Sequence, residues 1–218
     1  MKRLLLACVL AVCGASESRS EKLIISLSTH RVLITSNFTG VELTLFGSIE
    51  ADAGTVSRSS AQTIVVTITG PKETVVTWRK QRFLGIWVNT ASRTFVGVPN
   101  YLAVLTNRPV ETIASPDALR RFQLGVRSFL LPQLIGSDVA DVSPDDLFRQ
   151  GFIRLKLENG LYLERPNAVT FLTPTLFRTG IPLPSNVPVG EYVVDVKLFA
   201  DGALIAREES AFEIVKAG

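Results

Sequence analysis

The stretch that decides the fold runs from Val187 to Gly218 and reads VPVGEYVVDVKLFADGALIAREESAFEIVKAG. Side chains of a strand point alternately to its two faces, so the pattern from residue 192 to 198 predicts a strand with one buried face. The residues predicted on that face are Tyr192, Val194, Val196 and Leu198. Asp201-Gly202 favours a two-residue turn with positive φ. The chain then returns through residues 204–206, which predicts a β-hairpin, and Phe212, Ile214 and Val215 are predicted to form a last strand.

Short strands of the same kind are predicted on both sides of the middle of the chain. They cover residues 23–27, 31–35, 41–49, 63–69 and 74–78, and later 161–164, 168–172 and 176–181. Gly70-Pro71 separates two of them, and the Ser-rich residues 51–62 are predicted to be a loop or strand edge. Asn37-Phe38-Thr39 fits a glycosylation sequon but is interpreted as a turn.

Two short helices are predicted between the strand-rich parts. Ser115-Pro116-Asp117 is a typical helix start, and apolar residues follow it at helical spacing until Pro132. Those apolar residues are Leu119, Phe122, Val126 and Leu130. Ser143-Pro144-Asp145-Asp146 is a second start, and Asn159-Gly160 favours a left-handed stop. The buried face of the second helix is predicted at Phe148, Phe152 and Leu155.

These elements predict a mainly β protein with Ig-like β-sandwich regions and a short two-helix segment. The predicted boundaries are a signal peptide at 1–15, an N-terminal β-sandwich domain at 16–114, a helical segment at 115–160 and C-terminal Ig-like strands at 161–218. The pattern leaves open whether the two β regions form one domain or two.

The first residues have the composition of a signal peptide. Lys2 and Arg3 precede the apolar run 4–12, and Cys13-Gly14-Ala15 supplies small residues, which predicts export with cleavage near Ala15. No later stretch approaches the roughly 18 apolar residues of a transmembrane helix.

Cleavage at that point changes both the thiol content and the charge. Both cysteines, Cys8 and Cys13, would be removed, so no disulfide is expected in the mature chain. Lipid attachment at Cys13 is an alternative, although Val12 is a poor residue before a lipidated cysteine. Without Lys2 and Arg3, 21 of the 23 Lys and Arg remain against 20 acidic residues, a net charge of +1. This balance gives no reason to expect nucleic acid as a partner.

One basic and aromatic cluster stands out as a candidate partner surface. Its members are Trp78, Arg79, Lys80, Arg82 and Trp87, with Phe83 between them. Trp and Arg are enriched in interface hot spots, and aromatic residues among cations can also stack on bases. The favoured interpretation is that Trp78 and Trp87 fill the sandwich core while the three basic residues line a solvated turn.

No catalytic, cofactor-binding or metal-binding residue is predicted. His30 is the only histidine, and Ser28 and Thr29 beside it would point to opposite faces of a strand, so His30 is interpreted as a structural or surface residue. The acidic cluster Asp138, Asp141, Asp145 and Asp146 lacks the Gly and terminal Glu of an EF-hand. Asp145 and Asp146 are better explained as residues of a first helical turn.

Five long motifs suggest a family. They are WRKQRFLGIWVN (78–89), VPNYLAVLTNRPV (98–110), NGLYLE (159–164), LFRTGIPLPSNVPVGEYVVDVKLFADG (176–202) and the closing FEIVKAG. Together they resemble the putative transmembrane protein family of alphaproteobacteria over nearly all of the chain. The resemblance implies an exported, β-rich extracytoplasmic part and a single C-terminal membrane helix. This sequence stops at Gly218, about where that helix would begin, so either the chain is trimmed or this member lacks the anchor.

These observations predict a non-enzymatic, membrane-associated accessory or interaction protein without cofactors. Its expected location is the periplasm, at the inner membrane, and its expected partner is an inner-membrane protein or transporter. The alternative is a periplasmic ligand-binding protein or a hydrolase with two carboxylates in a cleft. A third possibility is polysaccharide or envelope binding through Trp78 and Trp87, if both are exposed.

Overall fold

The structure is a computed structural model, and it describes residues 22–50 and 62–217. The signal peptide predicted at 1–15, with both cysteines, and the loop predicted at 51–62 lie outside these residues, apart from Gln62. The strands are β1 (Lys22–Leu27), β2 (Arg31–Ile34), β3 (Gly40–Glu50), β4 (Gln62–Thr69), β5 (Lys72–Phe83), β6 (Ile86–Pro99), β7 (Leu102–Thr106), β8 (Pro132–Ile135), β9 (Asp138–Asp141), β10 (Tyr162–Arg165), β11 (Thr170–Phe171), β12 (Leu176–Pro184), β13 (Gly190–Ala200) and β14 (Ala203–Lys216). The helices are α1 (Pro116–Arg121), α2 (Leu147–Glu158) and the 3-10 turn η1 (Val110–Thr112).

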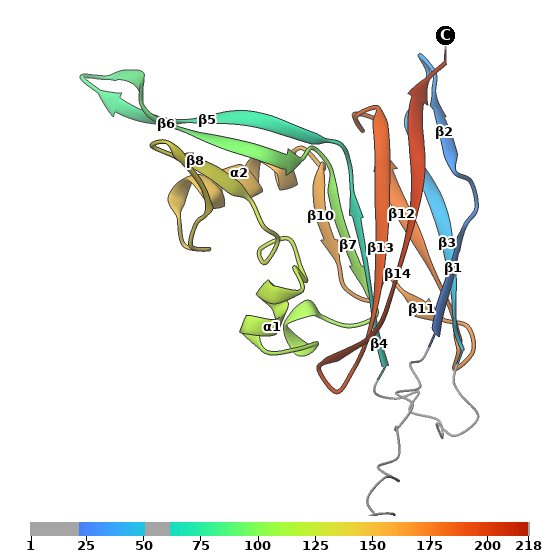
Figure 1. Cartoon of the computed structure of the whole chain (residues 1–218). Helices are drawn as coiled ribbons and strands as arrows, with labels where there is room; N and C mark the ends of the chain where they lie inside the picture. The colour runs from blue at the N-terminus through green and yellow to red at the C-terminus, as the bar shows by residue number, and fades with distance from the viewer. Residues whose placement is uncertain (1–21, 51–61, 218) are drawn as a thin grey trace, which may run out of the picture.

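The described strands form three sheets (Figure 1). Sheet A has the order β1-β3-β12-β11, sheet B the order β10-β7-β4-β13-β14-β2, and sheet C the order β5-β6-β8-β9. The main core lies between sheets A and B, where Leu45 and Ile181 meet Ile64, Val66 and Val196. The mainly β class with two α-helices is confirmed. Sheets A and B each combine strands from the N-terminal and the C-terminal β-rich parts. The predicted domain boundaries and the Ig-like type stay predictions.

Sheets B and C are joined by one long two-stranded ribbon. Strand β4 runs into β5 and β6 runs into β7, while β4 pairs with β7 and β5 pairs with β6. At the bend the backbone N–H of Gly70 donates to Tyr101 O at 2.9 Å, and that of Asn100 donates to Pro71 O at 2.9 Å. The proximal half of the ribbon therefore lies in the core, and its distal half leaves the body with the two strands still paired, apart from a register shift between Glu73 and Val75 (Figure 1).

The proximal half of the ribbon is buried on both faces. Ile64, Val66 and Ile68 of β4 face sheet A, whereas Val65 and Val104 face a second core that includes Phe152 of α2. A strand covered on both sides has no polar face to alternate with, so it shows a continuous apolar run instead of period two. This explains why β7 had no strand prediction although all five of its residues are buried.

The terminal hairpin agrees with its prediction. Tyr192, Val194, Val196 and Leu198 are all buried in the main core. Asp201 and Gly202 have φ of 50° and 79°, as a two-residue turn between Ala200 and Ala203 requires. The returning strand and the last strand prove to be one element, β14, which continues from Ala203 to Lys216.

The helical segment was predicted in part. Ser115 caps α1, and its side chain accepts from the N–H of Ala118, but α1 ends at Arg121 and does not continue to Leu130. Gln123 and Gly125 adopt positive φ there, which no α-helix tolerates, so the helical spacing of the apolar residues was misleading. Strands β8 and β9 after this loop had no prediction.

Helix α2 follows the prediction at its ends but not on its whole buried face. Asp146 is the N-cap, and its carboxylate accepts from the N–H of Arg149 at 2.8 Å. Gly160 follows the helix with φ of 68°, which confirms the left-handed stop. Phe152 is buried, but Leu155 is 46% exposed, and Arg149 and Ile153 are buried in its place.

The bend of the ribbon gives a stability prediction. A Cβ on Gly70 would lie 2.5 Å from Asn100 Oδ1 and 2.9 Å from a ring carbon of Tyr192, so Gly70→Ala must displace packed groups. We expect it to lower the free energy of unfolding by about 1–3 kcal/mol. Gly151→Ala is the matched control, because no atom lies within 4 Å of its new Cβ and alanine favours a helix. Urea denaturation should show the control unchanged or slightly stabilised, and equal effects of the two variants would contradict the role of the bend.

Candidate functional site

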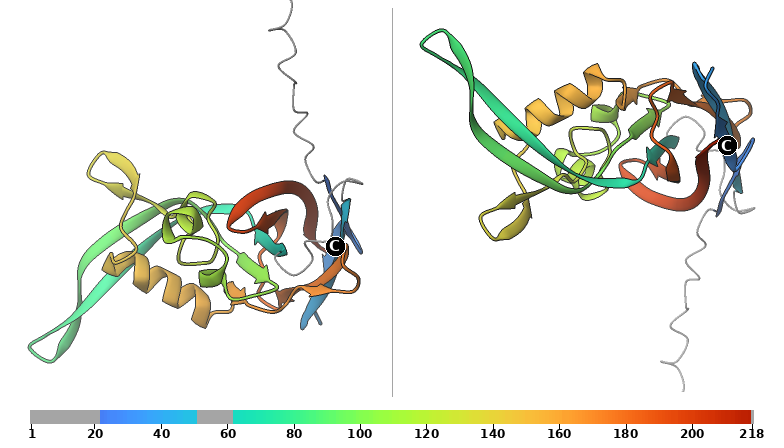
Figure 2. Two further views of the ribbon diagram at one scale, coloured as in Figure 1. Left: turned by 90° about the horizontal axis from the view of Figure 1, so that it is seen from below. Right: turned by 90° about the horizontal axis from the view of Figure 1, so that it is seen from above.

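The end of the long ribbon projects from the body as an uncovered hairpin. Every residue from Trp78 to Ser92 is exposed, and we call this segment, residues 78–92, the distal hairpin. Views from below and from above both show it extending beyond the helices and sheets A and B (Figure 2). It contains all five residues of the candidate partner surface, so the ribbon does bring them onto one projecting element.

Large apolar side chains crowd the distal hairpin although none of them is buried. Five of them are more than half exposed, at 57% for Trp78, 66% for Phe83, 88% for Leu84, 67% for Ile86 and 66% for Trp87. The prediction that both tryptophans fill the sandwich core is therefore wrong. The ribbon residues that are buried in the two cores belong to β4, β7, the bend and the end of β6 next to the bend. Both tryptophans lie farther along the ribbon, where no other element covers it.

The turn of the hairpin puts a leucine in an unfavourable conformation. Leu84 and Gly85 form the two-residue connection between Phe83 and Ile86, with φ of 49° and 85°. Turns of this type usually carry Asn, Asp or Gly at the first position, because a side chain with positive φ is strained. Leu84 is thus both strained and exposed, so a leucine at this position does not stabilise the fold.

The register of the hairpin sorts its side chains onto two faces. Arg82 pairs with Trp87, and Lys80 with Asn89, so these four residues share one face with Trp78. The opposite face carries Phe83, which pairs with Ile86, and Arg79. An irregularity between Arg79 and Lys80 is taken up on β6, so the alternation along β5 continues unbroken. The distal hairpin has three cationic side chains and no acidic one.

Helix α2 braces the base of the hairpin. Phe95 of β6 stacks on Phe152 with ring centroids 4.4 Å apart, and Lys156 Nζ lies 2.5 Å from Glu73 Oε1 of β5. The hydroxyl of Tyr162 donates to Pro99 O at 2.7 Å, and burial raises the pKa of this tyrosine, so it stays a neutral donor. The hairpin therefore projects from a packed base.

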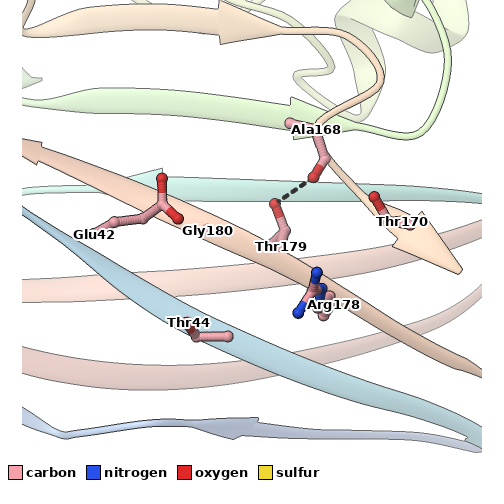
Figure 3. Close-up of a pocket in the computed structure, with 7 residues that line it drawn as sticks. All are labelled: Glu42, Thr44, Ala168, Thr170, Arg178, Thr179 and Gly180. Carbon is pink, nitrogen blue, oxygen red and sulfur yellow. Dashed lines mark hydrogen bonds between the residues drawn. The ribbon is translucent and has the colours of Figure 1, made fainter. Parts of the chain in front are cut away.

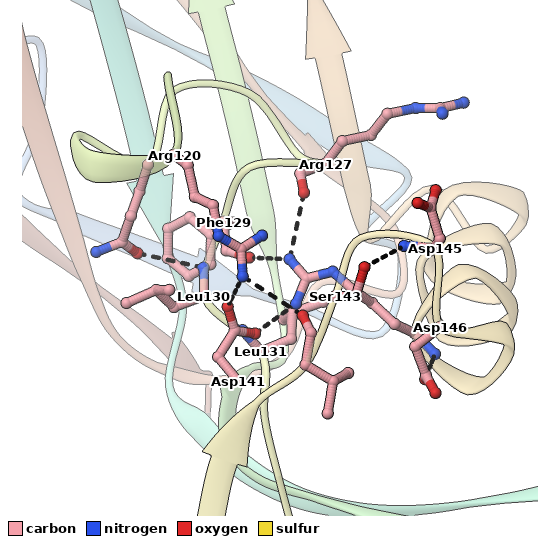
Figure 4. Close-up of polar contacts among 12 residues, drawn as sticks. Arg120, Arg127, Phe129, Leu130, Leu131, Asp141, Ser143, Asp145 and Asp146 are labelled. Carbon is pink, nitrogen blue, oxygen red and sulfur yellow. Dashed lines mark hydrogen bonds and ion pairs between the residues drawn. The ribbon is translucent and has the colours of Figure 1, made fainter. Parts of the chain in front are cut away.

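The residues of the acidic cluster lie in different places and have separate contacts. Asp141 accepts from Arg149 Nη1 at 2.5 Å and from Arg120 Nη2 at 2.7 Å, and the guanidinium of Arg149 is fully buried (Figure 4). Asp146 caps α2 and Asp145 directly precedes it, so both lie just before the helix, and the prediction that they belong to its first turn is wrong by one or two residues. Asp138 is exposed at the tip of β8–β9. Residues 22–50 and 62–217 contain no cluster of three potential metal ligands.

His30 lies on the surface, as interpreted. Its Nδ1 is 2.8 Å from Ala211 O, and its backbone oxygen accepts from the N–H of Glu213. Ser28 accepts from the N–H of Thr44, and the hydroxyl of Thr29 contacts the backbone of Arg31. These are the contacts of a turn between β1 and β2. The predicted turn at the sequon is also present, with the N–H of Phe38 donating to Thr35 O.

Two cavities are relevant to the alternative of a ligand site. One, of about 290 Å³, lies on sheet A, where Glu42 and Arg178 line it and Thr179 donates to Ala168 O (Figure 3). The other, of about 360 Å³, lies on sheet B and holds two carboxylates. There Asp195 pairs with Lys197 and Arg207, and Glu209 pairs with Arg207 at 2.5 Å.

Comparison with known proteins assigns the chain to a family. The family model described as "Putative transmembrane protein" (Alph_Pro_TM) matches residues 22–218. The chain belongs to this family. No curated protein and no solved structure matches it. Within the residues that the structure describes, neither α-helix has the length and apolar character needed to cross a membrane.

Sequence reasoning found the cationic and tryptophan residues of the site but missed its tip. Leu84 and Ile86 were not selected, and Phe83 was noted without being assigned to the partner surface. A signal existed, because Leu84-Gly85 separates two runs rich in β-branched and aromatic residues, as a two-residue hairpin connection does. What no pattern showed is that nothing covers the hairpin.

Tryptophan fluorescence tests the exposure of the hairpin directly, because the chain has two tryptophans and both lie on it. We expect iodide and acrylamide both to quench most of the emission, with an emission maximum typical of hydrated indole. Trp78→Phe and Trp87→Phe report the two positions separately. Weak quenching of either single-tryptophan variant, at a level typical of buried indole, would contradict the exposed position.

Proposed function

We propose that this chain is a non-enzymatic, membrane-associated accessory protein that works outside the cytoplasm and makes its contact through the distal hairpin. The observation that carries the proposal is a run of fifteen exposed residues, of which five are large apolar residues more than half exposed, held on a braced base. Membership in a family described as transmembrane supports the membrane association.

The energetics of the hairpin support a binding role over a structural one. Burial of a large apolar side chain contributes about 1.5–3 kcal/mol, and the isolated hairpin forgoes this at five positions. Contiguous exposed apolar surface of this kind marks interaction sites on soluble domains. Trp and Arg are also the residue types that most often dominate binding energy.

The start of the sequence supports the proposed compartment, and the packing of the sheets supports the proposed fold type. The basic and apolar start of the sequence supports export to the periplasm, with a location at the inner membrane and an inner-membrane protein or transporter as partner. The face-to-face packing of sheets A and B supports an Ig-like sandwich as the type of body from which the hairpin projects.

A periplasmic ligand-binding protein or carboxylate-based hydrolase is the second candidate. The cavity beside Asp195 favours it, because the hydroxyl of Thr67 lines this cavity, is buried and has no hydrogen-bond partner. The ion pairs of Asp195 and Glu209 weigh against a hydrolase, since neither carboxylate is free to act as nucleophile or base.

Fractionation with a shortened hairpin tests the proposal. Thr77 and Arg93 are cross-strand partners, so replacing residues 78–92 by Asn-Gly closes the ribbon at a two-residue turn. We expect the chain ending at Gly218 to be exported and recovered partly with membranes, and the shortened variant to move to the soluble periplasmic fraction. Urea denaturation of both proteins checks that the body remains folded. Recovery of both proteins in the cytoplasm would overturn the proposal.

A further inference from the structure

We propose that the surface bound by the distal hairpin is an anionic lipid bilayer, into which the tip inserts to a shallow depth. This inference rests on the proposed membrane-associated function and names the partner of the same site. The residues assigned to the apolar boundary are Phe83, Leu84 and Ile86, and those assigned to the headgroups are Arg79, Lys80 and Arg82.

The tip carries apolar side chains on both faces and at its end, which favours a fluid medium over a protein groove. Phe83 and Ile86 occupy one face, Trp87 lies beside Arg82 on the other, and Leu84 forms the end. A protein interface commonly covers one face of a hairpin and leaves the other to solvent. A bilayer surrounds whatever enters it, so side chains on both faces and at the end are buried together.

The order of residues along the hairpin matches the layers of a membrane surface. The apolar side chains are at the tip, Trp87 and its cross-strand partner Arg82 lie directly behind them, and Lys80 follows farther back on the same face. Tryptophan prefers the interface between apolar and hydrated layers. Long cationic side chains extend their charged ends toward the headgroups from a buried stem.

Charge complementarity selects the lipid type. The distal hairpin carries three cations and no anion, although the chain as a whole is nearly balanced at +3 among 23 basic and 20 acidic residues. Each cation close to an anionic membrane surface strengthens binding severalfold, and salt weakens this attraction. A neutral lipid surface would use the apolar tip but not the cations behind it.

The hairpin is preorganised for insertion but only to a limited depth. Its packed base and formed turn mean that little ordering is needed on binding. The outer edges of a two-stranded ribbon carry unpaired N–H and C=O groups, which are costly in hydrocarbon. The turn and the first residue pairs behind it can therefore enter the boundary, while the rest of the ribbon stays hydrated.

The tip of the hairpin is free to meet a flat surface. It extends to one side of the molecule, while strand β14 ends at Lys216 on the opposite side (Figure 2). A bilayer that approaches the tip from its own side therefore meets no other element first.

Vesicle binding by the full chain ending at Gly218 tests the inference. The probes are phosphatidylcholine vesicles with about 30% phosphatidylglycerol, close to the anionic content that draws cationic segments, and vesicles of phosphatidylcholine alone. We expect co-sedimentation and a blue shift of tryptophan emission with the anionic vesicles, both reduced by added salt. Quenching by lipids brominated near the headgroups should exceed quenching by lipids brominated at the chain ends.

Two variants with matched controls separate the apolar from the electrostatic contribution. Leu84→Asn keeps a residue that accepts positive φ and should weaken partitioning about tenfold, whereas Leu33→Asn, at a leucine 56% exposed on β2, should not. The double variant Lys80→Glu and Arg82→Glu should weaken binding to anionic vesicles at least tenfold. Its control is Lys22→Glu with Arg154→Glu, two exposed positions away from the hairpin.

The outcomes distinguish this inference from the proposed function. Absence of vesicle binding, or binding that the Leu84→Asn and Lys80/Arg82 variants leave unchanged, overturns the lipid inference. If the hairpin then crosslinks to an inner-membrane protein in cells, the proposed function stands with a protein as its partner. If the exported chain neither associates with membranes in cells nor binds vesicles, both are overturned.

Discussion

The structure depends on the bend that carries one ribbon out of the core. Two backbone hydrogen bonds, from Gly70 to Tyr101 and from Asn100 to Pro71, keep the strands paired where the ribbon passes from sheet B to sheet C. Gly70 leaves room there for the side chain of Asn100, and Pro71 has no N–H that would need an acceptor. Because pairing continues through the bend, the exposed hairpin is anchored by strands β4 and β7, which are among the most buried in the molecule.

A second constraint fixes the direction in which the hairpin leaves. The buried guanidinium of Arg149 donates to Asp141 and to the backbone oxygens of Arg127 and Phe129, which ties α2 to the loop after α1. Loss of the carboxylate would leave an unpaired charge inside the protein, a change that typically costs about 3–5 kcal/mol. Held in this way, α2 presents Phe152 to Phe95 and so sets the base of the hairpin.

The sequence could predict the parts of the fold in which one strand face is buried and the other is solvated. The terminal hairpin shows this in the first half of β13, because Tyr192 and Val194 are buried while Glu191 and Val193 between and before them are exposed, and Asp201-Gly202 marks the turn. Strand β7 was not predicted, because it is covered on both faces and has no polar face. The predicted extension of α1 to Leu130 was wrong, because the spacing of apolar residues does not show that Gln123 has a positive φ. The tryptophans were misplaced for a related reason: local pattern gives the face of a residue, while its burial depends on what packs there.

The charges on the hairpin resolve a conflict that its apolar tip creates. A long two-stranded ribbon with free edges and exposed apolar side chains is a typical site for pairing with another copy of the same chain. Arg79, Lys80 and Arg82 oppose this, because two such hairpins brought edge to edge would place six cations together without a counterion on either one. The same three charges do not oppose an anionic surface. The composition of the hairpin thus disfavours self-association while it permits contact with an anionic partner, and this selectivity requires no pocket.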